Sequence, residues 1–131
     1  MKTTYSATTH DIRISVLSEY QESVSDPEED AYVFTYRVII ENLGTEIVKV
    51  MRRHWNIIDT AGLRQTVNGD GVVGEQPVIY PGDAYEYGSW CKLTAETGKM
   101  WGIYEVRKLS DNSMLDVTIP EFMLIPEYRK N

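Results

Sequence analysis

Alternation between apolar and polar residues at every second position constrains this chain more than any other feature of its sequence. From residue 32 to residue 40, aromatic or aliphatic residues occupy each even position, with polar residues such as Thr35 between them. Residues 12–16, 100–106 and 115–119 repeat the pattern. A two-residue period sends successive side chains to opposite faces of a β-strand, and aromatic and β-branched residues suit a half-buried pleated surface. The pattern therefore predicts strands with one buried face.

Turn-forming residues separate these stretches and indicate the number of strands. Clusters of Gly, Pro, Asn, Asp and Ser, which favour turns, occur at Asn42–Gly44, Asp59–Gly62, Asn68–Gly71, Pro81–Asp83, Glu96–Gly98 and Asp111–Ser113. These turns imply about seven strands, a number typical of an immunoglobulin-like or fibronectin type III-like β-sandwich. The sequence therefore predicts an all-β fold of that class.

The length of the chain indicates one domain. A chain of 131 residues has the usual size of a single domain, and no repeat or linker divides it. We expect the sandwich to cover residues 11–126. Residues 1–10 and 127–131 are then expected to be flexible amino-terminal and carboxyl-terminal tails.

Residues 46–59 allow two interpretations. Six residues of this segment, most of them apolar, fall at helical spacing, as in an amphipathic helix. Its five β-branched residues and its strand-rich surroundings favour a strand instead. The alternation changes phase between Val50 and Trp55, so the strand needs a β-bulge near residues 51–54. On this interpretation Trp55 lies in the core between the sheets.

The charge balance narrows the classes of partner. The chain has a formal net charge of −7 and a pI near 4.8, whereas a nucleic-acid binder needs a basic face. We therefore expect no nucleic-acid partner. The longest apolar runs, such as residues 38–40, are too short to cross a bilayer, so we expect no membrane span. Cys91, the only cysteine, cannot form an internal disulfide, which fits a cytoplasmic protein.

Residues 69–74 read Gly-Asp-Gly-Val-Val-Gly, which matches the dinucleotide-binding pattern G-x-G-x-x-G. That site requires a helix to begin at the glycines, because the amino terminus of the helix binds the pyrophosphate. Pro77 and Pro81 forbid such a helix, and Asp70 places a carboxylate where the phosphates would lie. The pattern alone therefore does not indicate a Rossmann site.

A weaker ligand hypothesis survives for the same turn. Backbone amides in a glycine turn can form an anion-binding nest without a helix. Gly69, Gly71 and Gly74 are then the candidate ligand-binding residues, with Arg53 or Arg64 supplying positive charge to a nucleotide or pyrophosphate. The simpler interpretation is that the glycines only supply positive φ for a tight connection between strands.

The sequence contains no recognisable cluster of residues suited to catalysis or to metal binding. His10 and His54 are the only histidines, and neither lies at ligand spacing from Cys91. Cys91 and His54 could form a nucleophile pair, but a lone thiol is more often an inert small hydrophobe. The acidic residues between Glu19 and Asp30 support a weaker hypothesis of divalent-ion binding, although they do not match a calcium loop. We expect no catalytic residue, no metal site and no cofactor.

An ordered series of residues spread over about residues 11–125 carries a family resemblance. Its members are Tyr36, Val38, Ile40, Asn42–Gly44, Arg53, Trp55, Ile57, Asp59, Gly62, Gly69–Pro77, Ile79, Pro81–Gly82, Tyr85, Tyr87, Ser89, Leu93–Thr94, Gly98, Met100, Gly102, Tyr104, Ile119–Pro120, Phe122 and Leu124. This series resembles the signature of the ApaG domain family. So many matches in order are much more specific than the three glycines alone.

The resemblance implies a fibronectin type III-like β-sandwich with no established catalytic residues, in agreement with the strand count. It also implies protein–protein interaction, because the domain occurs alone in bacteria and as a module of F-box proteins and a polymerase-delta-interacting protein. Bacterial members are linked by gene neighbourhood to a diadenosine-tetraphosphate hydrolase, and by the family name to cobalt resistance and magnesium efflux. At Trp90 the family usually has a small residue, so a binding surface there has a different shape in this chain.

We therefore expect a non-enzymatic binding module whose protein partner the sequence does not identify. The sandwich pattern, the many aromatic residues and the lack of a catalytic cluster motivate this expectation. A sheet edge accepts a partner strand through main-chain hydrogen bonds, and Trp90 and Trp101 are the candidate anchors for a partner. Uncovered sheet edges also allow the chain to pair with itself as a homodimer.

Overall fold

Nine strands and three short 3-10 helices make up residues 3–129, the part of the chain that the computed structural model describes. The strands are β1 (Thr4–Thr9), β2 (Ile12–Tyr20), β3 (Tyr32–Asn42), β4 (Val48–Asp59), β5 (Arg64–Asp70), β6 (Val78–Ile79), β7 (Ala84–Leu93), β8 (Gly98–Lys108) and β9 (Met114–Leu124). The 3-10 helices are η1 (Glu22–Val24), η2 (Pro27–Glu29) and η3 (Glu127–Arg129).

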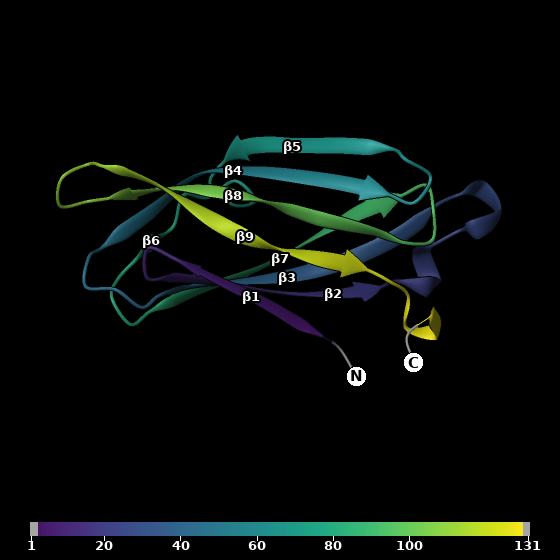
Figure 1. Ribbon diagram of the computed structural model, residues 1–131, viewed down its shortest axis with the longest axis horizontal. Helices are drawn as coiled ribbons and strands as arrows, with labels where there is room; N and C mark the ends of the chain where they lie inside the picture. The colour runs from purple at the N-terminus through teal and green to yellow at the C-terminus, as the bar shows by residue number, and fades with distance from the viewer. Residues whose placement is uncertain (1–2, 130–131) are drawn as a thin grey trace.

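The strands form two antiparallel sheets packed as a sandwich (Figure 1). The four-stranded sheet has the order β1-β2-β3-β7, and the five-stranded sheet has the order β5-β4-β8-β9, with β6 pairing to β4. In Figure 1, β5 runs along one long margin of the molecule. This architecture confirms the predicted all-β sandwich, while β1 and the two-residue β6 raise the strand number above the expected seven.

The amino-terminal residues do not form the expected flexible tail. Thr4–Thr9 form β1, which pairs with β2 over its whole length. His10 and Asp11 join the two strands with positive φ values of 52° and 63°, as a two-residue type I′ hairpin turn requires. The tail prediction is therefore wrong for β1, because its turn lacks the glycine that normally signals such a hairpin. Residues 1–2 lie outside the described part of the chain.

The carboxyl-terminal residues also contact the sandwich. Beyond β9, η3 places the ring of Tyr128 5.9 Å from the ring of Tyr20, and the Tyr128 hydroxyl donates a hydrogen bond to Glu96. The expected tail at residues 127–131 is therefore wrong for residues 127–129, because an aromatic contact and a hydrogen bond hold them. Residues 130–131 fall outside the described range.

The ambiguous segment is strand β4, and its register shifts between Val50 and Arg52 in the pairing with β8. This shift is the predicted β-bulge, so the strand interpretation is confirmed and the helix is excluded. Since the bulge changes the phase of the alternation, Val50 and Trp55 both face the interior, with exposed fractions of 0% and 2%.

Aromatic rings fill the centre of the core. The ring of Trp55 lies 5.5 Å from Tyr36, 6.3 Å from Tyr104 and 5.9 Å from Phe122, as measured between ring centroids. These residues come from β4, β3, β8 and β9, so one tryptophan joins both sheets. Along β3 the even-numbered residues from Phe34 are buried, as the alternation predicted. No helix within residues 3–129 is long and apolar enough to span a membrane.

Candidate functional site: a cleft between two edge strands

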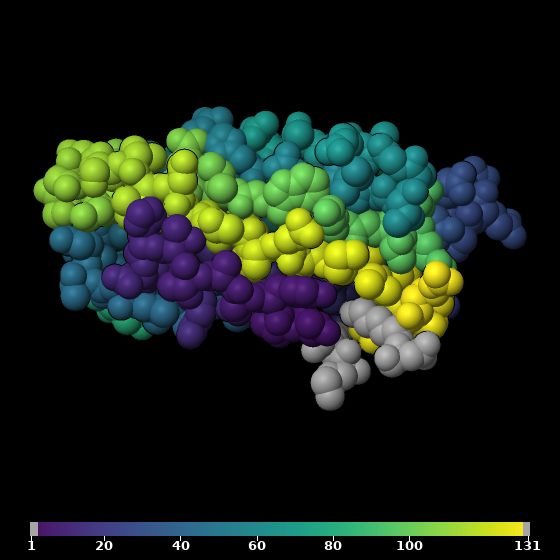
Figure 2. Space-filling model, in the orientation of Figure 1, coloured from purple at the N-terminus to yellow at the C-terminus, as the bar shows by residue number. Residues whose placement is uncertain are grey.

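The two lateral sides of the sandwich are built differently. On the side bounded by β1 and β9, the ring of Tyr5 lies 6.4 Å from that of Phe122, and Thr118 N donates to Thr9 Oγ1. We call this the closed side. In Figure 2 the purple surface of β1 meets the yellow surface of β9. The opposite side, bounded by β5 and β7, is the open side: between these strands Gln65 Nε2 donates a hydrogen bond of 3.1 Å to Lys92 O.

A cleft of about 430 Å³ lies on the open side. Its size falls within the range of sites that bind small molecules or side chains of a partner. Its lining combines aromatic residues with the cationic residues Arg53 and Lys92. The lining residues are Tyr36, Arg53, Trp55, Ile57, Gln65, Val67, Val73, Tyr87, Ser89, Trp90, Cys91 and Lys92.

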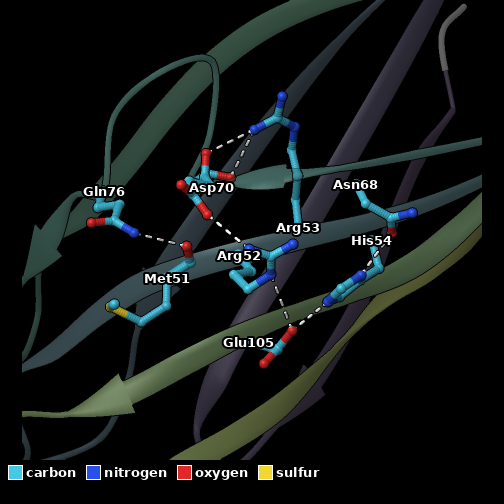
Figure 3. A network of polar contacts seen from close by, with 9 residues as sticks. Met51, Arg52, Arg53, His54, Asn68, Asp70, Gln76 and Glu105 are labelled. Atoms are coloured by element: carbon cyan, nitrogen blue, oxygen red, sulfur yellow. Dashed lines mark hydrogen bonds and ion pairs between the residues drawn. The ribbon is translucent and has the colours of Figure 1, made fainter.

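Arg53 is the charged residue on the inner side of this cleft. It follows the bulge of β4 in the same phase as Trp55 and Ile57, which are buried. Its Nη1 donates to two main-chain carbonyls, at 2.9 Å to Asp70 O and 3.2 Å to Gly71 O (Figure 3). The predicted charge donor Arg53 therefore does meet the glycine segment, but through carbonyl oxygens.

Gly69 and Gly71 have structural reasons to be glycine. A Cβ at Gly69 would lie 3.0 Å from both terminal nitrogens of Arg53, so the missing side chain makes room for the guanidinium. A Cβ at Gly71 would lie 1.7 Å from Glu75 O, and its φ is +54°. Close approach and positive φ both favour glycine here.

The rest of the glycine segment is a tight turn that uses its own amides. Val73 and Gly74 have φ values of 44° and 83°, while Val72 and Glu75 exchange backbone hydrogen bonds of 2.7 and 3.0 Å. Gly71 N donates to Met51 O at 2.7 Å. The chain continues into β6 and no helix begins there, so the Rossmann interpretation is excluded.

Arg64 does not join this turn. It lies at the opposite end of β5, where it pairs with Ile58, whereas Gly69 pairs with Arg53. The glycines are thus accounted for by backbone geometry and by packing against Arg53. Anion binding at Gly69, Gly71 and Gly74 stays a prediction, and three amides of the turn already donate to main-chain carbonyls.

The buried polar groups behind the cleft are arranged to stay neutral. The hydroxyls of Tyr87 and Tyr104 hydrogen-bond to each other, and burial raises the pKa of both. Burial also raises the pKa of the Cys91 thiol to about 12, so the thiol is protonated at neutral pH. A protonated thiol is a poor nucleophile, which supports the inert role expected for Cys91.

His54 lies away from Cys91, on the outer face of the five-stranded sheet. Asn68 Oδ1 lies 2.7 Å from its Nδ1, and the Glu105 carboxylate hydrogen-bonds its Nε2 (Figure 3). The hydrogen bond to Glu105, followed by that to Asn68, raises the pKa of His54. Arg52 extends this network with an ion pair of 2.9 Å to Asp70. The structure therefore does not assemble a Cys91–His54 pair.

The two candidate tryptophan anchors lie on different surfaces. Trp90, on edge strand β7, borders the cleft and exposes 65% of its surface. Trp101 pairs with Asn56 on the outer face of the five-stranded sheet, and Lys99 Nζ lies 5.4 Å from its ring centroid. One partner surface therefore does not include both residues.

The acidic stretch forms a structured connection. Residues 22–24 and 27–29 are η1 and η2, and Asp26 forms an isolated bridge with Ala31. Asp30 takes the left-handed conformation at the end of η2, with φ of 53°. Within residues 3–129, no group of three or more His, Cys, Asp or Glu side chains is placed to hold a metal ion.

Several cleft residues were not singled out from the sequence. Tyr36 was recognised as an alternating strand residue, and Tyr36 and Tyr87 both as members of the family series, whereas Gln65 and Val67 carried no signal. Their role depends on which strands become edges of the sheets. The pairing of β5 with β4 alone places Val67 at the cleft, and the local sequence of β5 contains no long alternation that could have indicated this.

Comparison with known proteins identifies the family of this chain. Residues 22–108 match the family model described as the ApaG domain. The chain is 46% identical to Protein ApaG of Brucella canis over 127 residues, covering 96% of this chain and 97% of the relative. It is 46% identical to Protein ApaG of Paramagnetospirillum magneticum over 126 residues, covering 96% of each chain.

A solved structure supports the fold. A Bordetella pertussis protein described as ApaA superposes with a TM-score of 0.86 at 38% identity, covering 92% of this chain and 98% of that one. A family model that spans most of the sandwich, relatives of nearly equal length and a close structural match all agree. This chain therefore belongs to the ApaG family.

Proposed function

We propose that this chain is a non-enzymatic binding module whose protein partner docks on the open side. The observation that carries the proposal is Trp90, which leaves 65% of its surface exposed on an edge strand, directly beside the cleft. Large exposed aromatic residues next to a concave site are frequent anchors of protein interfaces. The reduced thiol of Cys91 suits the cytoplasm, where we place this interaction.

The physical reason to favour binding over catalysis lies in the ionisable groups of the cleft. Burial keeps Tyr87 and Cys91 protonated, so neither supplies a base or an anionic nucleophile at neutral pH. Arg53 and Lys92 bring positive charge to the lining of the cleft. Such a site recognises shape and negative charge.

The test compares two tryptophan variants in a capture experiment. Purified wild-type, Trp90→Ala and Trp101→Ala chains are immobilised and exposed to lysate of the source organism, and bound proteins are quantified by mass spectrometry. Trp101→Ala is the matched control, because it removes the same side chain from the outer face of the other sheet. We expect Trp90→Ala to lose roughly tenfold or more of a specific partner, while Trp101→Ala retains it. Equal recovery by all three chains would contradict the proposal.

A further inference from the structure

The interior surface of β5 has no strand opposite it. Residues paired across two strands share a face of the sheet, so Val67 faces inward with its partner Trp55. Trp55 is 2% exposed, yet Val67 is 40% exposed. An inward-facing valine that is open to water shows that the four-stranded sheet ends before it covers β5.

To cover β5, the four-stranded sheet would need one more strand next to β7, which is its edge strand on this side. Lys92 O points away from β3, because it accepts the hydrogen bond from Gln65 on the open side. The orientation of Val33, the β3 partner of Lys92, supports this. The Val33 carbonyl accepts a hydrogen bond from Gln21 N on the β2 side, so Val33 and Lys92 do not hydrogen-bond to each other.

Main-chain groups of successive strand residues point in alternate directions. The orientation of Lys92 therefore also applies to Glu86, Gly88 and Trp90, whose N–H and C=O groups face the unpaired edge. No proline interrupts β7, so each of these residues retains its donor. A strand added here would lie opposite β5 and would cover Val67.

The charges at this position favour an acidic segment. The cleft is lined by Arg53 and Lys92 and by no Asp or Glu, although the chain has a net charge of −7. The hydrogen bonds of Arg53 go to main-chain carbonyls, and no carboxylate of residues 3–129 forms an ion pair with it. A guanidinium without a carboxylate, facing an uncovered strip, is a ready partner for an incoming anion.

We propose that β7 accepts an extended, acidic segment of the partner protein as an added strand. The segment continues the four-stranded sheet, an apolar side chain on its inner face covers Val67, and an Asp or Glu side chain pairs with Arg53. The proposal rests on the proposed function and specifies the chemistry of the partner. Main-chain hydrogen bonds contribute affinity in this mode, and side-chain contacts contribute specificity.

The probe is a displayed library of random 12-residue peptides, selected on the full-length chain. We expect the selected peptides to be enriched in Asp and Glu. Hydrogen exchange with a selected synthetic peptide should then show added protection at the amides of Glu86, Gly88 and Trp90. Protection at these three amides reports strand addition, which a purely structural role of Arg53 would not produce.

The variants are Val67→Asp and its matched control Val78→Asp. Val67 and Val78 are 40% and 43% exposed, so both substitutions place a carboxylate on a partly exposed strand position. Only Val67→Asp puts that carboxylate beside Arg53, where it competes with the peptide. We expect roughly tenfold or greater loss of affinity for Val67→Asp, and little change for Val78→Asp. Unlike a variant of Arg53, neither removes the hydrogen bonds that hold the glycine segment.

Three results would overturn the added strand. The selected peptides could lack acidic enrichment, the protected amides could lie outside β7, or a second copy of the chain could occupy β7 and form a dimer by sedimentation. If peptides bind through Trp90 without protecting β7, the added strand is wrong while the proposed function stands. If neither peptides nor proteins are captured, both proposals are wrong.

Discussion

The closed and open sides of this sandwich treat their edge strands differently: one side is covered by packing between the sheets, and the other is left exposed. Both sides are bounded by edge strands, whose unpaired main-chain groups invite other chains. On the closed side, β1 packs against β9 through the contact of Tyr5 with Phe122. On the open side, Val67 and Trp90 leave 40% and 65% of their surfaces exposed. The side chains at the closed side thus complete the core, whereas Val67 and Trp90 at the open side are available to a partner.

The two sides differ in whether their residues contribute to folding stability or to binding. Residues of the closed side contribute to the core, so their substitution should cost folding free energy. Residues at the mouth of the open side contribute little to the core and should affect binding alone.

The largest effect is expected for Phe122→Ala on the closed side. Phe122 is 0% exposed, and its ring contacts those of Tyr5, Tyr36 and Trp55. Its truncation should lower the free energy of unfolding by about 3–5 kcal/mol, because a large cavity forms. Urea denaturation measures this cost. Met123→Ala, at the neighbouring and 39% exposed position, is the control. A cost near that of the control would remove the distinction between the two sides.

Asp59 holds one end of the open side together. It is buried, and its carboxylate accepts hydrogen bonds from the amides of Ala61 and Leu63 and from the amide and hydroxyl of Thr94. These bonds connect the β4–β5 turn to the end of β7. Asp59→Ala should cost about 2–3 kcal/mol, because several hydrogen bonds to a charged acceptor at a buried position are lost.

The pH dependence of Asp59 sharpens this prediction. Burial disfavours the carboxylate, but the hydrogen bonds from Thr94, Leu63 and Ala61 outweigh burial, so the pKa of Asp59 is lowered. A lowered folded-state pKa gives stability that is present above the unfolded value and is lost as pH falls through the folded value. The cost of Asp59→Ala should therefore shrink below about pH 4. An unchanged cost in acid would contradict this account.

A smaller effect is expected where His54 fastens β5 to the sheet. The pKa of His54 is raised by its hydrogen bonds to Glu105 and Asn68, and Asn68 belongs to β5. A raised folded-state pKa gives stability that is present below the unfolded value, about 6.5, and is lost as pH rises through the folded value.

His54→Gln should therefore lower the melting temperature more at pH 5.5 than at pH 9. The cost should stay below about 1 kcal/mol, because the pair is partly exposed to solvent. Circular dichroism melts at both pH values measure the difference. A cost that is the same at both values would show that the imidazolium does not fasten β5.

The smallest effect on folding is expected for Trp90→Ala. Its side chain is largely exposed, so its loss should change the free energy of unfolding by no more than about 0.5 kcal/mol. Urea denaturation of the variant provides this value, and Trp55→Ala, in the core, is the contrasting control. A loss above about 1 kcal/mol would mean that Trp90 stabilises the fold and is not reserved for a partner.

Some of the site could be read from the sequence because it depends on local chemistry. The phase change in β4 predicted the bulge, and the bulge turns Arg53 and Trp55 toward the interior. Pro77 and Pro81 excluded a helix after the glycines, and none begins there. Trp90 was selected as an anchor, and the structure leaves it exposed beside the cleft.

Other parts depended on contacts between distant segments. The hairpin at His10 and Asp11 was missed because both residues adopt positive φ without glycine, so β1 was interpreted as a tail. Arg64 was grouped with Gly69 as a possible source of positive charge for a ligand at the glycine turn. An extended strand separates them, and the pairing with β4 gives each a different neighbour.

The all-β class, the bulge and the buried alternation could be predicted from the sequence alone, since they follow from side-chain period and backbone preference within a few residues. Which strands are edges, and which lateral side is open, depends on how distant strands pair and pack. Alternation reports that a strand has an inner face, but not whether another strand lies opposite that face. Val67 shows the physical reason: its environment depends on where the four-stranded sheet ends, at β7.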